Sequence, residues 1–134
     1  MLNAMKTRSI LDSHFYHDGR GPELQRVIWR NNGITLVGFE FYNPDDIYEE
    51  KNIKNIELVN VEAFALASEE VHGNIMATGD SQAAIYEVLD SDWIKSFQPR
   101  HLSKCKHFQI MFYDEIYDVI CEDIVPGSGP LQLA

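Results

Sequence analysis

Cysteine and long apolar runs are scarce in this sequence of 134 residues. Its only cysteines are Cys105 and Cys121, too few for the disulfide framework of a small secreted domain. No apolar run approaches the ~20 residues of a membrane-spanning helix. The first residues, MLNAMKTRS, lack the apolar segment of a signal peptide. We therefore expect a single cytoplasmic domain over residues 1–134, with reduced thiols and no membrane contact.

Basic residues are also few, because 11 lysines and arginines stand against 21 aspartates and glutamates, for a net charge of −10. A surface of this sign repels nucleic-acid phosphates, so we expect no nucleic-acid partner. Clustered acids would instead steer a basic protein partner. We expect such a docking surface at the acidic block Asp45, Asp46, Glu49 and Glu50.

The sequence does contain a clear strand pattern over Lys106–Val125, where apolar residues alternate with other types. This period of two predicts a β-hairpin with one buried face. A reversal at Asp114-Glu115 would place the apolar positions of the two limbs opposite each other. The predicted pairs are Phe112 with Tyr117, Ile110 with Val119 and Phe108 with Cys121.

The rest of the chain also favours strands, joined by turn-forming residues. Residues 63–71 fit either a strand or a short helix, and the pattern leaves both open. We expect a mainly β fold, an antiparallel sandwich or half-barrel of hairpins with one or two short helices; an α+β fold is the alternative. Residues 1–9 and 126–134 are predicted to be loose termini. The expected strands are Ile10–Tyr16, Glu23–Arg30, Ile34–Tyr42, Ile53–Leu66 and Ile85–Leu89, with a helix over Ser91–Gln98 capped by Asp90.

The second face of the predicted C-terminal hairpin is too apolar for a freely solvated surface. Met111, Tyr113 and Ile120 all lie on it. We expect this face to be covered, either by the helix that contains Trp93 or by another chain. These three residues are therefore candidates for partner binding, and pairing of exposed edge strands into a homodimer is a further expectation.

Histidines supply the candidate polar sites. The predicted hairpin register places His107 opposite Glu122, a pair that could hold a general base in one tautomer. His14, His17 and Asp18 are the candidates for metal ligands, but no second motif with ligand spacing accompanies them. We therefore expect neither a metal nor a cofactor.

The segment His107–Ile124, HFQIMFYDEIYDVICEDI, resembles the C-terminal hairpin of small uncharacterised bacterial β-rich proteins. Some of these are immunity proteins that occur beside polymorphic toxins. A looser similarity extends over Pro22–Phe41. The resemblance implies a β-rich fold. It is also consistent with a non-enzymatic protein-binding module, such as an immunity-type inhibitor of a cationic partner.

The residues leave a second function open, a small-ligand-binding or hydrolytic β-barrel with a His-containing pocket. Its polar group would be His107 or His17. No nucleophile elbow or cysteine-enzyme signature accompanies them, so the sequence favours a protein without enzymatic activity. The aromatic cavity of this alternative would be lined by Trp29, Phe39, Phe41 and Tyr117.

Overall fold

The structure is a computed structural model that describes residues 6–9, 22–30, 33, 35–43, 47–72, 84–97 and 100–131. The predicted strand Ile10–Tyr16 lies outside the described residues. So do the metal candidates His14, His17 and Asp18, together with Asp45 and Asp46 of the acidic block.

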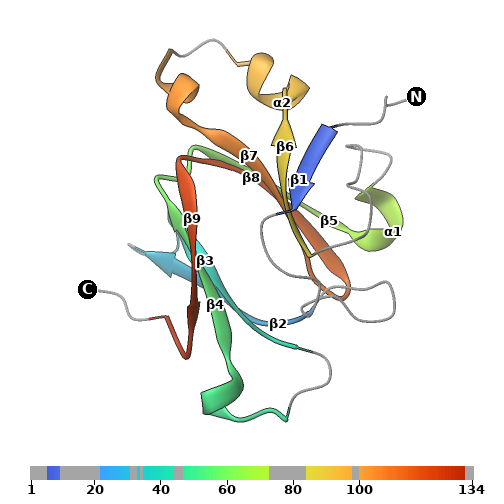
Figure 1. Cartoon of the computed structure of the whole chain (residues 1–134), viewed down its shortest axis with the longest axis vertical. Helices are drawn as coiled ribbons and strands as arrows, with labels where there is room; N and C mark the ends of the chain where they lie inside the picture. Colours follow the sequence, from blue (N-terminus) through green and yellow to red (C-terminus); the bar gives the residue numbers. More distant parts are fainter. Residues whose placement is uncertain are drawn as a thin grey trace.

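The fold consists of two antiparallel β-sheets, as the sequence predicts (Figure 1). The five-stranded sheet has the order β1-β6-β7-β8-β5, and the four-stranded sheet has the order β2-β3-β4-β9. Only short helical segments accompany them in the described part of the chain: η2 (Glu50–Asn52), α1 (Glu69–His72), α2 (Asp92–Lys95) and η3 (Arg100–Lys104). The strands are β1 (Lys6–Ser9), β2 (Glu23–Arg30), β3 (Thr35–Tyr42), β4 (Lys54–Val59), β5 (Ala63–Ser68), β6 (Ile85–Leu89), β7 (Lys106–Met111), β8 (Glu115–Cys121) and β9 (Asp123–Ser128).

A corner at Asn60 connects the two sheets. The prediction of one long strand over Ile53–Leu66 is wrong, because the chain leaves β4 at Asn60 with a φ of 54° and enters β5 in the other sheet. Asparagine tolerates this left-handed conformation better than most residues do. β8 and β9 turn the same corner beside it, where the Glu122 N–H donates to the Val59 carbonyl over 2.8 Å. The segment 63–71 contains a strand to Ser68, followed by α1.

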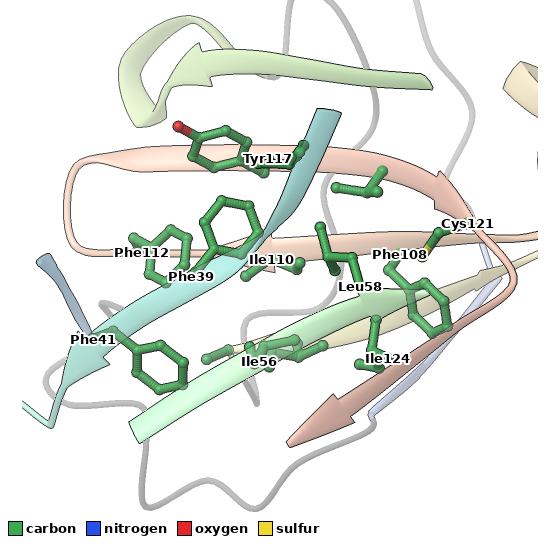
Figure 2. Packing of buried hydrophobic residues seen from close by; sticks show 14 residues of the cluster. Phe39, Phe41, Ile56, Leu58, Phe108, Ile110, Phe112, Tyr117, Cys121 and Ile124 are labelled. Atoms are coloured by element: carbon green, nitrogen blue, oxygen red, sulfur yellow. The ribbon is translucent and has the colours of Figure 1, made fainter. Parts of the chain in front are cut away.

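Aromatic rings fill the space between the sheets (Figure 2). The ring of Phe39 lies 4.6 Å from that of Tyr117 and 5.2 Å from that of Phe112, measured between centroids. Phe41 packs against Phe112 as well, at 5.8 Å. Trp29 is separate, with 37% of its surface exposed. The aromatic cavity of the ligand-binding alternative is therefore not formed by these residues, since three of the four fill the core.

The C-terminal hairpin has the predicted faces but a different register. Phe108 pairs with Val119 and Ile110 with Tyr117, two residues away from the predicted partners. The turn lies one residue earlier than predicted, at Tyr113-Asp114, since the Phe112 N–H donates to the Glu115 carbonyl over 2.7 Å. A shift by two residues conserves the side-chain faces, because strand side chains alternate. All the predicted inward residues lie in the core: Phe108, Ile110, Phe112, Tyr117, Val119 and Cys121.

The predicted loose termini contain strands. Lys6–Ser9 forms β1, which pairs with β6. Pro126 and Gly127 lie within β9, where an edge position tolerates a residue that cannot donate a backbone hydrogen bond. The helix α2 is shorter than predicted, and its N-cap is Ser91 rather than Asp90.

Candidate functional site

The outer face of the five-stranded sheet is buried within the protein. Met111 is 7% exposed and Ile120 is fully buried, so neither side chain is available to a partner in this conformation. Tyr113, by contrast, is 40% exposed. Two short helices pack on this face, α1 beside β8 and α2 beside β7. One of the two expected covers, the helix with Trp93, is therefore present, and the Trp93 ring lies 5.1 Å from that of His107.

A chain of buried polar side chains lies beneath these helices, and we call it the polar network. Its central residue is Asp118 on β8. His107 Nε2 lies 2.6 Å from Asp118 Oδ1, and His72 Nε2 lies 2.6 Å from Asp118 Oδ2. Gln109 donates to Asp118 Oδ1 over 3.1 Å, and Ser91 Oγ lies 2.7 Å from His107 Nδ1. The network therefore joins the strands β7 and β8 to both covering helices.

The charge on Asp118 determines the direction of these hydrogen bonds. Burial raises the pKa of Asp118, but hydrogen bonds from His107 and His72 outweigh this effect and leave the pKa below its ordinary value. An ionised carboxylate can only accept, so each histidine Nε2 carries the donated proton. Ser91 Oγ accepts from the Ile94 N–H over 3.2 Å, and in the neutral form of His107 the ring Nδ1 accepts from the Ser91 hydroxyl.

Ser91, His107 and Asp118 have the connectivity of a nucleophile, a base and an orienting acid. A shallow hollow of about 280 Å³ borders Ser91 and His107. The exposed fractions are low, however: 6% for Ser91 and 1% for His107. The Ser91 hydroxyl oxygen also caps α2, so it already has a donor and an acceptor. The immediate consequence of the network is structural, because it attaches α1 and α2 to the sheet.

The predicted polar pair His107–Glu122 is wrong. The two-residue shift of the hairpin places His107 opposite Ile120, and Glu122 lies at the corner between the sheets, where Asn60 donates to it. Sequence reasoning also missed Asp118 as the partner of His107. A signal was present, because His107, Gln109 and Asp118 share the outer face with apolar residues, where isolated polar groups need partners.

A second feature lies at the free edge of β5. Within the described residues β5 pairs only with β8. Phe64 and Leu66 on this strand are 41% and 53% exposed, and the Phe64 ring lies 5.6 Å from that of Trp29 on β2. We call Trp29, Phe64 and Leu66 the β5 patch. Large apolar side chains gathered at an open sheet edge are typical of an interaction surface.

The other three sheet edges have features that discourage pairing with a second chain. β1 contains Arg8, β2 has two register shifts against β3, and β9 contains Pro126. The sequence of β5, AFALAS, has no charge and no proline, and its pairing with β8 shows no register shift. In the described part of the chain, β5 is the one edge of these four without such protection.

Acidic residues border the β5 edge. Glu62 immediately precedes the strand and Glu70 follows it in α1, and both are exposed. Glu49 and Glu50 of the predicted acidic block are exposed too, but they lie before β4, whereas β5 follows the end of β4. The length of β4 therefore separates Glu49 and Glu50 from the start of β5.

Cys105 is half-buried and Cys121 is buried, and they form no disulfide. The described residues contain no group of three or more His, Cys, Asp and Glu side chains able to hold a metal ion. No helix in that part of the chain is both long and apolar enough to span a bilayer.

Comparisons with protein-family models, curated proteins and solved structures found no match to this chain.

Proposed function

We propose that the protein is a non-enzymatic protein-binding module that docks a cationic partner on the β5 edge. The observation that carries this proposal is the strand β5, which pairs with β8 alone among the described strands and exposes Phe64 and Leu66 beside Trp29. Aromatic side chains at the centre of an interface supply much of the binding energy, and charged residues are depleted there. The β5 patch has both properties.

Charge supports a basic partner. The net charge of −10 steers a cationic protein toward the surface, and Glu62 and Glu70 lie at the two ends of the docking strand. The segment His107–Ile124 resembles the hairpin of small β-rich proteins, some of which are immunity proteins, and together with the charge this leads us to propose an immunity-type role. In that role the partner is a positively charged toxin domain, whose activity is blocked while it is bound.

Site-specific photo-crosslinking in the source cells tests the proposal. The photoreactive residue p-benzoylphenylalanine replaces Leu66 in one variant and Val125 in the other. Val125 is a matched control, because it is 48% exposed and lies on the edge strand β9 of the other sheet. We expect a basic protein to be crosslinked from position 66 and not from position 125.

Binding must then be reproduced with purified components. The crosslinked protein, once identified and purified, should bind the wild-type chain, and the Leu66→Lys variant should bind at least about tenfold more weakly. The Val125→Lys variant should bind like the wild type. Equal crosslinking from both positions, or crosslinks only to other copies of this chain, would contradict the proposal.

A second candidate function is the hydrolysis of an ester or amide at Ser91, favoured by the spacing of 2.7 Å between Ser91 Oγ and His107 Nδ1. Ser91 Oγ would attack the carbonyl carbon while His107 takes the hydroxyl proton; His107 would then give that proton to the departing alcohol or amine as the C–O or C–N bond breaks, and water would release the acyl group from Ser91. A fluorophosphonate probe followed by mass spectrometry tests this function. An adduct on Ser91 that disappears in the His107→Gln variant would support it, and an unlabelled folded protein would rule it out.

A further inference from the structure

We infer that the partner binds by adding a β-strand to β5, and that this strand is apolar along one face and has cationic residues at its ends. The inference rests on the proposed function and specifies how the partner is recognised. Strand addition satisfies backbone groups at an open edge, while the alternate side chains of the added strand provide specificity. β5 contains six residues, which is a normal length for such pairing.

The pairing of β5 with β8 shows which side chains would meet the added strand. Phe64 lies opposite Val119 and Leu66 opposite Tyr117, so the two exposed side chains extend from the face that also forms the core. The other face of β5 carries Ala63, Ala65 and Ala67. An added strand would therefore place alternate apolar side chains beside Phe64 and Leu66, and its remaining side chains beside small alanines.

The space next to Phe64 fits an apolar side chain of the added strand. A hollow of about 280 Å³ lies between the start of β3 and the start of β5. Its walls include Leu36, Val61 and Phe64, and Glu62 lies at its margin. An apolar group bound here would lie against these side chains, while a cationic neighbour would be within reach of Glu62.

The acidic ends of β5 favour a cationic strand over a second copy of this chain. A symmetric pairing centred on Ala65 would keep the faces matched, with Phe64 of each copy opposite Leu66 of the other. It would also bring together two chains that each carry −10. The end of β5 that carries Glu62 would then lie beside the end of the other copy that carries Glu70, and like charges at an interface weaken binding.

A seven-residue probe peptide tests the inference with the whole chain. The probe is acetyl-Lys-Ile-Thr-Ile-Thr-Ile-Lys-amide, whose isoleucines share one face of a strand and whose lysines lie at the ends. Nuclear magnetic resonance of the ¹⁵N-labelled protein reports its binding. We expect shift changes in residues 63–68 and in the Trp29 indole. The same changes should occur in Val125→Lys and be absent in Leu66→Lys.

Two altered probes separate strand addition from other contacts. A twin that is N-methylated at all five residues between the lysines retains the side chains but cannot donate those backbone hydrogen bonds in either register, so it should not bind. A twin with glutamate in place of both lysines should bind about tenfold more weakly at low salt. If the N-methylated twin binds as well as the parent, strand addition is wrong. If the parent peptide leaves residues 63–68 unchanged, the inference also fails.

The proposed function is judged separately, by the crosslinks from position 66. A position-66 crosslink to a basic protein, combined with equal binding of the N-methylated peptide, would retain the protein-binding function and reject strand addition. Self-association is measured in parallel by light scattering. A concentration-dependent dimer lost in Leu66→Lys but not in Val125→Lys would assign the β5 edge to a second copy and overturn the inference.

Discussion

Removal of the Asp118 carboxylate is the sharpest test of the polar network. In the Asp118→Ala variant the donors of His72, His107 and Gln109 lose their acceptor. All three residues are at most 1% exposed, so bulk water cannot replace the carboxylate. A buried donor without a partner costs about 1–3 kcal/mol, and breaking a buried pair by removing one member typically costs about 3–5 kcal/mol. We expect a loss of about 3–5 kcal/mol in the free energy of unfolding.

The Asp118→Asn variant should lose less. The amide keeps one oxygen that can accept, so we expect a loss of about 1–3 kcal/mol. Urea unfolding followed by tryptophan fluorescence measures both variants, because Trp93 packs against His107. Glu50→Gln, an exposed acid-to-amide change, is the control and should be nearly neutral. A loss below about 1 kcal/mol for Asp118→Ala, with an unchanged m-value, would refute the argument that this network holds the helices to the sheet.

The difference in unfolding free energy between the wild type and Asp118→Asn should depend on pH, which provides an independent check. The pKa of Asp118 is lower in the folded protein than its ordinary value. The contribution of the Asp118 carboxylate to the free energy of unfolding is therefore complete above the unfolded pKa of about 3.9. This contribution is lost as the pH falls through the lower pKa of the folded state. The gap in unfolding free energy between the wild type and Asp118→Asn should narrow on acidification from about pH 5 to about pH 3. A gap that widens would contradict the lowered pKa.

Three further predictions concern the core, a close backbone approach and the thiols. Phe39→Ala should lower the free energy of unfolding by about 3–5 kcal/mol in the same urea assay, because its ring is fully buried between the sheets. Gly38→Ala should lower the free energy of unfolding by more than about 1 kcal/mol, since the new Cβ would collide with the Ile56 carbonyl oxygen. A neutral result would mean that β3 and β4 can separate at no cost. Cys121 should resist alkylation at neutral pH, because burial raises its pKa to about 12. Burial also raises the pKa of Cys105, which should react slowly. Mass spectrometry after iodoacetamide treatment measures both reactions, and rapid modification of Cys121 would contradict its burial.

The hairpin near the C-terminus shows how far alternation alone can predict structure. The period of two assigned its residues to the correct faces, because an error of two residues in register preserves the face of every side chain. The same error gave His107 the wrong neighbour, since a cross-strand partner depends on the position of the turn in the sequence. Loop geometry is set by backbone hydrogen bonds such as that from Phe112 to Glu115, which alternation does not encode.

The polar network was beyond sequence reasoning for a different reason. His72 and Asp118 are 46 positions apart, and they meet because β5 pairs with β8 and α1 follows β5 directly. Ser91 reaches His107 because β6 pairs with β7. No local pattern specifies either contact, although the presence of His107, Gln109 and Asp118 on an apolar face indicated that partners were needed.

The sequence by itself determined the β-rich class, the core face of the C-terminal hairpin and an acidic, cysteine-poor protein, because these follow from composition and from the alternation of side chains. The apolar residues on both faces of Ile53–Leu66 predicted one interior strand. Only the tertiary structure decided that the chain turns at Asn60 and that β5 becomes an edge. Strand order results from long-range pairing, and that order leaves Phe64 and Leu66 exposed where we propose that the partner binds.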